Sequence, residues 1–217
     1  MAKTAENYRS REYWIVENAQ YARPSFRLEK CARIVSGLAG GRACNLLDVG
    51  CGPAALRQVL PSNIDYYGMD IAIHQPASYL KEVDFGREPI SFNNMQFDFV
   101  VGMGILEYMG EHEQQKFEEI RKILKPDGKF ILSYINFDHF RKRVWPNYNN
   151  VQPIEKLVLS LKKVFNVDKY FPASHHWRQK QPGKYAVRPL QMHLNFKIPI
   201  ISPALAVEYF FVCSQKT

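Results

Sequence analysis

The stretch LLDVGCGPAAL, residues 46–56, constrains the fold of this chain more than any other because it reads as a strand, a glycine turn and a helix. The segment is apolar up to Asp48, as expected of a strand buried on both faces of a sheet. Gly50 and Gly52 follow; glycine lets a backbone approach a ligand closely, and a helix N-terminus presents free N–H groups. Such a turn is typical of proteins that hold an adenosine-containing cofactor.

Strands and helices alternate along the rest of the chain, which predicts a mostly parallel sheet covered by helices on both faces. Strands are expected at residues 44–50, 64–71, 97–106, 129–135, 166–173 and 206–214. Helices are expected over most of residues 8–38 and at residues 54–60, 111–124 and 154–165, with a KPDG turn at 125–128.

The length of 217 residues suits one well-packed α/β domain. The N-terminal stretch MAKTAENYRSREYW has no apolar signal core, and no apolar run reaches the roughly 20 residues that span a bilayer. We therefore expect a cytoplasmic protein without a membrane span. Four scattered cysteines form no C-x-x-C pair, so neither a metal site nor a disulfide framework is expected: Cys31, Cys44, Cys51 and Cys213.

The net charge of +8 is located in the last third of the chain. Residues 137–217 hold 13 Lys and Arg against 4 Asp and Glu. This excess suggests an anionic partner, such as a nucleic acid, a phosphorylated small molecule or a membrane surface. A basic surface that only keeps the protein in solution explains it equally well.

The glycine turn alone does not identify the cofactor. Read as G-x-G-x-x-A with Ala55 last, it would suit the pyrophosphate of a dinucleotide. Asp48 opposes that interpretation, because its carboxylate is awkward beside a pyrophosphate and well suited to an amino-acid ammonium group. Pro53 directly follows the second glycine and favours an immediate first helical turn.

Five segments in order resemble the motifs of class I S-adenosylmethionine (AdoMet)-dependent methyltransferases. After LLDVGCGPAAL come YYGMDI, EVDFG, FDFVVGMGILEYM and ILKPDGKFILSY, which together span residues 45–134. The resemblance implies AdoMet as cofactor and a three-layer α/β/α sandwich, with a seven-stranded, mostly parallel sheet and an antiparallel last strand. We expect one domain over residues 1–217, with a helical lid at 1–40, a cofactor-binding core at 44–134 and acceptor-side loops and strands at 135–217.

The resemblance also implies which residues contact the cofactor. Asp70 would bind the ribose hydroxyls, and Asp84 the exocyclic amine of adenine, with Phe85 beside the ring. In the lid, tyrosines and Arg23 would approach the methionine end, although helix packing also explains them: Tyr8, Tyr13 and Tyr21. The full predicted cofactor set is Asp48, Gly50, Cys51, Gly52, Asp70, Ile71, Asp84, Phe85, Gly102 and Met103.

The acceptor side is expected where NFDHFRKRVW follows the fifth strand and where SHHWRQK lies as a loop between the last two strands. A hydroxyl acceptor benefits from a base within hydrogen-bond reach, and the candidate bases are His139, His175 and His176. Arginines would hold an anionic group while aromatic rings stack on the acceptor. The candidate substrate-binding residues are Tyr108, Asn136, Arg143, Trp177 and Arg178, of which Tyr108 stands where many relatives have histidine. A surface or packing role is an alternative for each of these residues.

The sulfonium methyl is strongly electrophilic, so the protein has mainly to align a nucleophile with it. No N/D-P-P-Y stretch follows the fourth strand, and Cys51 lies in the cofactor loop. These observations favour methyl transfer to O or N of a small, anionic or sugar-like molecule over the best-marked nucleic-acid reactions. Two alternatives remain: an RNA or ribosome methyltransferase, and a non-catalytic partner protein. SYINFDHFRKRVW, which resembles small methyltransferase-like proteins associated with methionine biosynthesis, motivates the latter.

Overall fold

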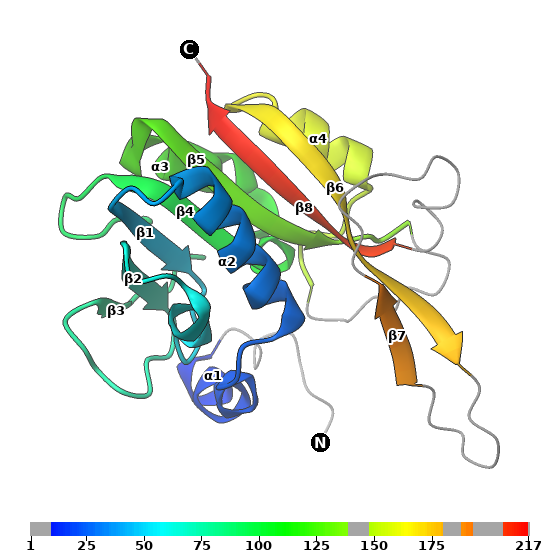
Figure 1. Cartoon of the computed structure of the whole chain (residues 1–217), viewed down its shortest axis with the longest axis horizontal. Helices are drawn as coiled ribbons and strands as arrows, with labels where there is room; N and C mark the ends of the chain where they lie inside the picture. The colour runs from blue at the N-terminus through cyan, green and yellow to red at the C-terminus, as the bar shows by residue number, and fades with distance from the viewer. Residues whose placement is uncertain (1–9, 139–147, 180–187, 193–205, 217) are drawn as a thin grey trace.

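The computed structural model describes residues 10–138, 148–179, 188–192 and 206–216, and only the backbone of residues 174–179 and 188–192 (Figure 1). These residues build one sheet in the order β3-β2-β1-β4-β5-β8-β6-β7. The strands are β1 (Cys44–Val49), β2 (Ile64–Asp70), β3 (Leu80–Glu82), β4 (Phe97–Met103), β5 (Leu124–Ile135), β6 (Phe165–Gln179), β7 (Arg188–Met192) and β8 (Ala206–Gln215). The helices are α1 (Arg11–Glu17), α2 (Phe26–Ala39), α3 (Glu113–Ile123) and α4 (Ile154–Leu161).

The sheet confirms the predicted α/β/α class. Strands β3, β2, β1, β4 and β5 pair in parallel, and β8 is inserted antiparallel between β5 and β6. These seven strands form the expected mostly parallel sheet with an antiparallel last strand. Strand β7 adds an eighth, because it pairs antiparallel with the far end of β6.

Two apolar layers lie on opposite faces of the sheet, because side chains alternate along each strand. Leu46 of β1 packs in the layer that includes Val35 of α2. Its neighbour Leu47 packs in the other layer, with Phe117 of α3 and Leu157 of α4. Figure 1 shows α2 on one face of the sheet and α3 and α4 on the other. In the parts of the chain with described structure, no helix is both long enough and apolar enough to cross a membrane.

Two predicted helices differ from the structure for local reasons. The helix expected at residues 54–60 is a short 3₁₀ helix, η3 (Ala55–Val59), since Ala54 takes a left-handed φ of 57° and Pro61 stops continuation. The long N-terminal helix is divided into α1, the 3₁₀ helix η2 (Asn18–Tyr21) and α2. Pro24 accounts for the break, because a residue before proline avoids the helical conformation.

The C-terminal third also differs from expectation. Helix α4 ends at Leu161 rather than Phe165, which already begins β6. SHHWRQK was predicted to be a loop, and its residues 174–179 instead belong to β6, where His175 pairs with Met192 of β7. The KPDG segment, predicted to be a turn, instead lies within β5, beside a register shift between Phe97 and Phe99 of β4.

Candidate active site

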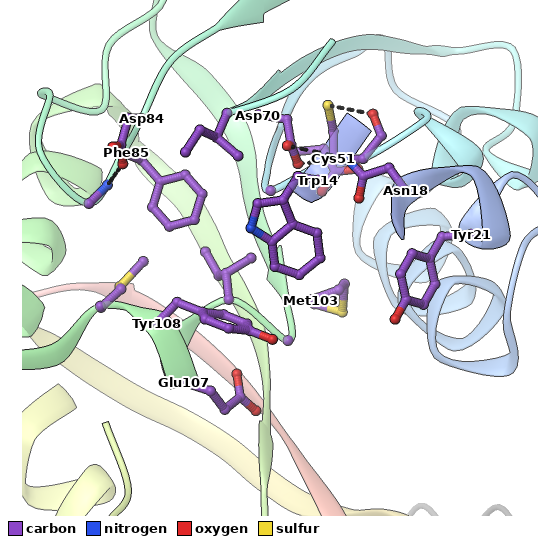
Figure 2. A pocket seen from close by; sticks show the side chains of 18 of the residues that line it. Trp14, Asn18, Tyr21, Cys51, Asp70, Asp84, Phe85, Met103, Glu107 and Tyr108 are labelled. Carbon is purple, nitrogen blue, oxygen red and sulfur yellow. Dashed lines mark hydrogen bonds between the residues drawn. The ribbon is translucent and has the colours of Figure 1, made fainter. Parts of the chain in front are cut away.

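A cavity of about 740 Å³ opens at the carboxyl ends of β1, β2 and β4, the edge where parallel α/β sheets bind ligands. It is walled on the outer side by α1 and η2 and extends to the short 3₁₀ helix η4 (Leu106–Tyr108) and to Tyr148. Figure 2 shows Trp14 near the centre of this cavity, with Asp70 on one side of it and Tyr108 and Glu107 on the other. The cavity therefore has two ends, one at the glycine turn and Asp70 and the other at Glu107 and Tyr108.

The glycine turn lies at the end of β1 and requires its two glycines. Gly50 and Gly52 have φ angles of 76° and 51°, which side-chain-bearing residues rarely adopt. A Cβ on Gly50 would clash with the side chain of Ile105. The N–H groups of Gly50 and Cys51 donate to the Met69 carbonyl at 2.8 and 3.1 Å, which fixes the turn against β2.

Asp70, at the end of β2, joins the turn to the N-terminal segment. Its Oδ2 accepts from the Gly52 N–H at 2.8 Å, and its Oδ1 accepts from the Ala72 N–H at 3.1 Å and from Asn18 Nδ2 at 3.5 Å. Burial raises the pKa of Asp70, while these backbone donors counteract part of that rise. A buried carboxylate is thus held in place by the chain and directed to the cavity.

Asp48 lies at the bottom of the same end and is 2% exposed. Its Oδ2 accepts from the Tyr66 hydroxyl at 3.0 Å. Burial raises the pKa of Asp48 to about 7, the Tyr66 hydrogen bond opposes this, and the Asp70 carboxylate adds to it. A cationic ligand group would therefore favour the ionised form of Asp48.

Asp84 and Phe85 lie across the cavity from the glycine turn, as Figure 2 shows. Asp84 accepts from the Gly86 N–H at 3.1 Å and forms a 3.6 Å ion pair with Arg87, whose side chain is largely exposed. The carboxylate and the ring are thus adjacent in the chain and line one wall.

The N-terminal segment covers the cavity with only one of the residues expected there, Tyr21. Trp14, Asn18 and Tyr21 line it, whereas Arg23 is not among the lining residues. Tyr13 packs edge-on against Trp14 at a centroid distance of 5.2 Å. Tyr8 lies outside the described residues.

Glu107 belongs to the second end of the cavity and follows directly on Leu106 after β4. It is 1% exposed, and its Oε1 accepts from the Ile135 N–H at 3.0 Å. Its Oε2 has no hydrogen-bond partner among the described residues. Burial raises the pKa of Glu107 to about 7, although the Arg27 guanidinium lowers it.

Arg27 of α2 lies beside Glu107 and forms a 2.5 Å ion pair with Glu208 of β8. Burial lowers the pKa of Arg27, but the Glu208 and Glu107 carboxylates more than offset this, so the net pKa is raised and the guanidinium stays charged. A Cβ on Gly104, whose φ is 75°, would come within 2.5 Å of Arg27 Nη1. Gly104 is therefore what allows the guanidinium to pass over the end of β4.

Aromatic rings complete this end. Tyr108 contacts Tyr148 edge-on at a centroid distance of 5.5 Å and Trp14 at 5.7 Å. Burial raises the pKa of Tyr108 well above its usual value, so its phenol stays neutral and is no base near neutral pH. Tyr108 therefore packs against neighbouring rings and also lines the cavity.

The structure places most of the sequence-predicted residues at the cavity. The ones that line it are Asp48, Gly50, Cys51, Gly52, Asp70, Ile71, Asp84, Phe85, Met103 and Tyr108. Gly102 is not among the lining residues, and a Cβ there would lie 2.8 Å from the Ile105 side chain. Asn136 is buried elsewhere: its amide donates to the Ala206 carbonyl at 2.7 Å and its Oδ1 accepts from the Asp138 N–H.

The remaining acceptor-side candidates are not located by side chain. His139 and Arg143 lie outside the described residues. His175, His176, Trp177 and Arg178 belong to β6, of which only the backbone is described at these positions. Their proposed roles stay predictions from the sequence.

Several cavity residues were missed by the sequence reasoning: Trp14, Asn18, Arg27, Glu107, Tyr148 and Asn149. Glu107 carried the clearest signal, because it directly follows the apolar stretch 97–106 that was predicted to be a strand, and ligands bind at the carboxyl ends of such strands. Arg27 carried none, since an arginine early in an amphipathic helix ordinarily faces solvent. Within the described ranges, no three histidine, cysteine or carboxylate side chains are arranged to hold a metal ion.

Comparisons with known proteins agree with this geometry. The family described as "Methyltransferase domain" matches residues 21–183. An S-adenosylmethionine-dependent methyltransferase from Clostridium acetobutylicum superposes with a TM-score of 0.61 at 12% identity, covering 88% of this chain and 92% of that one. The N-methyltransferase NodS from Bradyrhizobium japonicum, in complex with S-adenosylhomocysteine, gives 0.56 at 13% identity, covering 90% and 89%.

Among curated proteins, the chain is similar to a ribosomal RNA large subunit methyltransferase E from Brachyspira hyodysenteriae. The two are 25% identical over 167 residues, which cover 67% of this chain and 79% of that protein.

Proposed function

The chain belongs to the methyltransferase-domain family and uses S-adenosylmethionine, and we propose that it transfers the methyl group to an oxygen or nitrogen of a small molecule. The observation that carries the proposal is the two-ended cavity: a glycine turn with Asp70 at one end, and a buried, unpaired carboxylate oxygen of Glu107 at the other. One end suits the cofactor, and the other suits an acceptor.

At the cofactor end, each residue has a role that its surroundings support. Asp70 would accept from the ribose hydroxyls, because its carboxylate is held by backbone donors and directed to the cavity. Asp84 would accept from the adenine amine, with Phe85 against the ring. Asp48, buried beneath the turn, would complement the positive charge of the methionine moiety. Bound in this way, the cofactor supplies the electrophilic methyl group.

At the acceptor end, the described wall supports a sugar-like or amine acceptor more than an anionic one. The two arginines expected to hold an anionic acceptor, Arg143 and Arg178, fall in residues 139–147 and 174–180, whose side chains are not described. The described wall instead presents the Glu107 carboxylate, which accepts a hydrogen bond from a hydroxyl or an amine. The neutral Tyr108 phenol is a second group that an acceptor would meet.

Isothermal titration calorimetry with S-adenosylhomocysteine tests the proposal. Asp70→Ala should weaken binding by about tenfold or more, since a buried ionised acceptor is lost. Asp65→Ala is the matched control, because Asp65 lies on the same strand with an exposed side chain outside this cavity. No binding by the wild type, or equal binding by Asp70→Ala, would contradict the proposal and favour a non-catalytic partner protein.

A second candidate is methylation of RNA. The similarity to a ribosomal RNA methyltransferase and the excess of 13 Lys and Arg over 4 Asp and Glu in residues 137–217 favour it. Phosphate contacts would make the affinity for RNA fall steeply as salt rises. Fluorescence anisotropy with a ribosomal RNA fragment measures this dependence on salt. No binding at a low salt concentration of about 50 mM would exclude the candidate.

A further inference from the structure

Glu107 is a buried cavity residue for which cofactor binding gives no role. It lies beyond the cofactor end, with one oxygen held by the Ile135 N–H and the other unbonded among the described residues. A buried carboxylate oxygen left without a donor is costly, so native proteins supply a partner, from the chain or from a ligand. The partner here is expected to be a hydrogen-bond donor on the acceptor.

The charges around Glu107 say what kind of donor fits. Arg27 is paired with Glu208, so two carboxylates share one guanidinium and this end carries a net negative charge once Glu107 is ionised. The cavity as a whole has the same sign: its described lining holds five carboxylates and two guanidinium groups, namely Asp48, Asp70, Asp84, Glu107, Glu111, Arg27 and Arg87. Such a wall repels an anionic acceptor and attracts a cationic one.

The rings at this end favour the same ligand. Tyr108, Tyr148 and Trp14 form a chain of edge contacts beside Glu107. Electron-rich aromatic faces attract ammonium groups, and the attraction grows when water is excluded. A carboxylate flanked by such rings is a suitable site for an amine.

We propose that the methyl acceptor is an amine and that Glu107 is the catalytic residue that removes its proton. This inference rests on the proposed function, since it names the acceptor of the same site. Arg27 and Glu208 are positioning residues, because their ion pair sets the charge balance around Glu107 and Glu208 does not line the cavity.

The proton balance is simple. The ammonium group gives one proton to Glu107 Oε2 and becomes a neutral amine with a free lone pair. The nitrogen then attacks the methyl carbon, so that an N–C bond forms, the C–S bond breaks and its electron pair returns to sulfur. The products are an N-methylammonium and neutral S-adenosylhomocysteine, and Glu107 releases its proton to water.

The test compares three probes that share one ring: 2-phenylethylamine, 2-phenylethanol and phenylacetate. Each is titrated by calorimetry into protein saturated with S-adenosylhomocysteine. The amine should bind at least about tenfold more tightly than the other two, and Glu107→Gln should remove that preference. Glu118→Gln is the control, because it makes the same charge change at a half-exposed position of α3 outside the cavity, where Glu118 pairs with Arg121.

A pH series separates Glu107 from its neighbours. The groups that face it are Arg27 of α2, Glu208 of β8, Tyr134 of β5, Tyr108 and Tyr148. The tyrosines stay neutral and Arg27 stays charged across pH 6 to 8, about the range in which Glu107 ionises. Amine affinity should therefore rise from pH 6 to 8 in the wild type. Asp48 also ionises in this range. If the rise in amine affinity is absent from Glu107→Gln, the rise is due to Glu107 and not to Asp48.

Each outcome decides between the two proposals. If S-adenosylhomocysteine does not bind, the methyltransferase proposal itself fails. If S-adenosylhomocysteine binds but the amine does not bind, or binds no better than the alcohol or the carboxylate, the amine assignment is overturned. Equal amine binding by Glu107→Gln and the wild type also overturns it.

Discussion

Replacing Glu107 by glutamine should stabilise the protein at alkaline pH and have little effect at acidic pH. The pKa of Glu107 is raised from 4.5 to about 7 by burial, so the folded protein holds this proton more tightly than the unfolded chain. Its contribution to stability is complete below pH 4.5 and is lost as pH rises through 7. Linkage over this interval predicts a loss of about 2 kcal/mol between pH 5 and pH 8.

Glutamine keeps the shape of the side chain and still accepts from the Ile135 N–H, but it never becomes charged. Urea unfolding of both proteins at pH 5, 6.5 and 8 measures the effect. The difference in free energy of unfolding, variant minus wild type, should grow by about 2 kcal/mol from pH 5 to pH 8. Asp48 titrates in the same range in both proteins, so its contribution cancels in the difference.

Glu118→Gln provides the comparison, since Glu118 is half-exposed on α3 and its removal should leave the pH dependence unchanged. A difference between Glu107→Gln and the wild type that stays constant over pH 5 to 8 would refute the reasoning. It would mean that Glu107 is ionised in the folded protein throughout this range.

Three further variants test other parts of the site and fold. Gly50→Ala should lower stability by about 2 kcal/mol or more in thermal unfolding, because φ is positive there and the new Cβ clashes with Ile105. Glu113→Ala should cost about 3 kcal/mol in urea unfolding, since three side-chain donors meet its buried carboxylate. Trp14→Ala should leave the melting temperature nearly unchanged, because α1 has no buried residue, but should weaken S-adenosylhomocysteine binding severalfold in calorimetry.

The glycine turn and its strands were predictable because their signals are local. Asp48 and the glycines follow one another in the sequence, and the period of the apolar residues alone indicates which strands are buried. The short 3₁₀ helix η3 was not predictable. Pro53 suggests that a regular helix starts directly after the glycines, but the left-handed backbone of Ala54 prevents it. Strand β7 was missed because its pairing with β6 depends on a distant segment.

The acceptor end of the cavity was mostly invisible in the sequence for a physical reason. Arg27, Glu107 and Glu208 come from a helix, a short turn and the last strand, and only the folded sheet brings them together. Their types are also those of ordinary surface residues. The cofactor end is instead built from consecutive residues at strand ends, where spacing along the chain reflects position in space.

Helix α1 gives the protein a natural reporter of its own occupancy. Seven residues are too few to form a stable helix in isolation, and α1 buries none of them, so its amide hydrogens should exchange through local opening long before the sheet unfolds. Trp14 and the neighbouring Asn18 face the cavity, so a bound cofactor adds contacts that the open segment lacks. Exchange protection in α1 would then measure the fraction of molecules loaded with cofactor, while protection in β1 and β4 would measure the global stability.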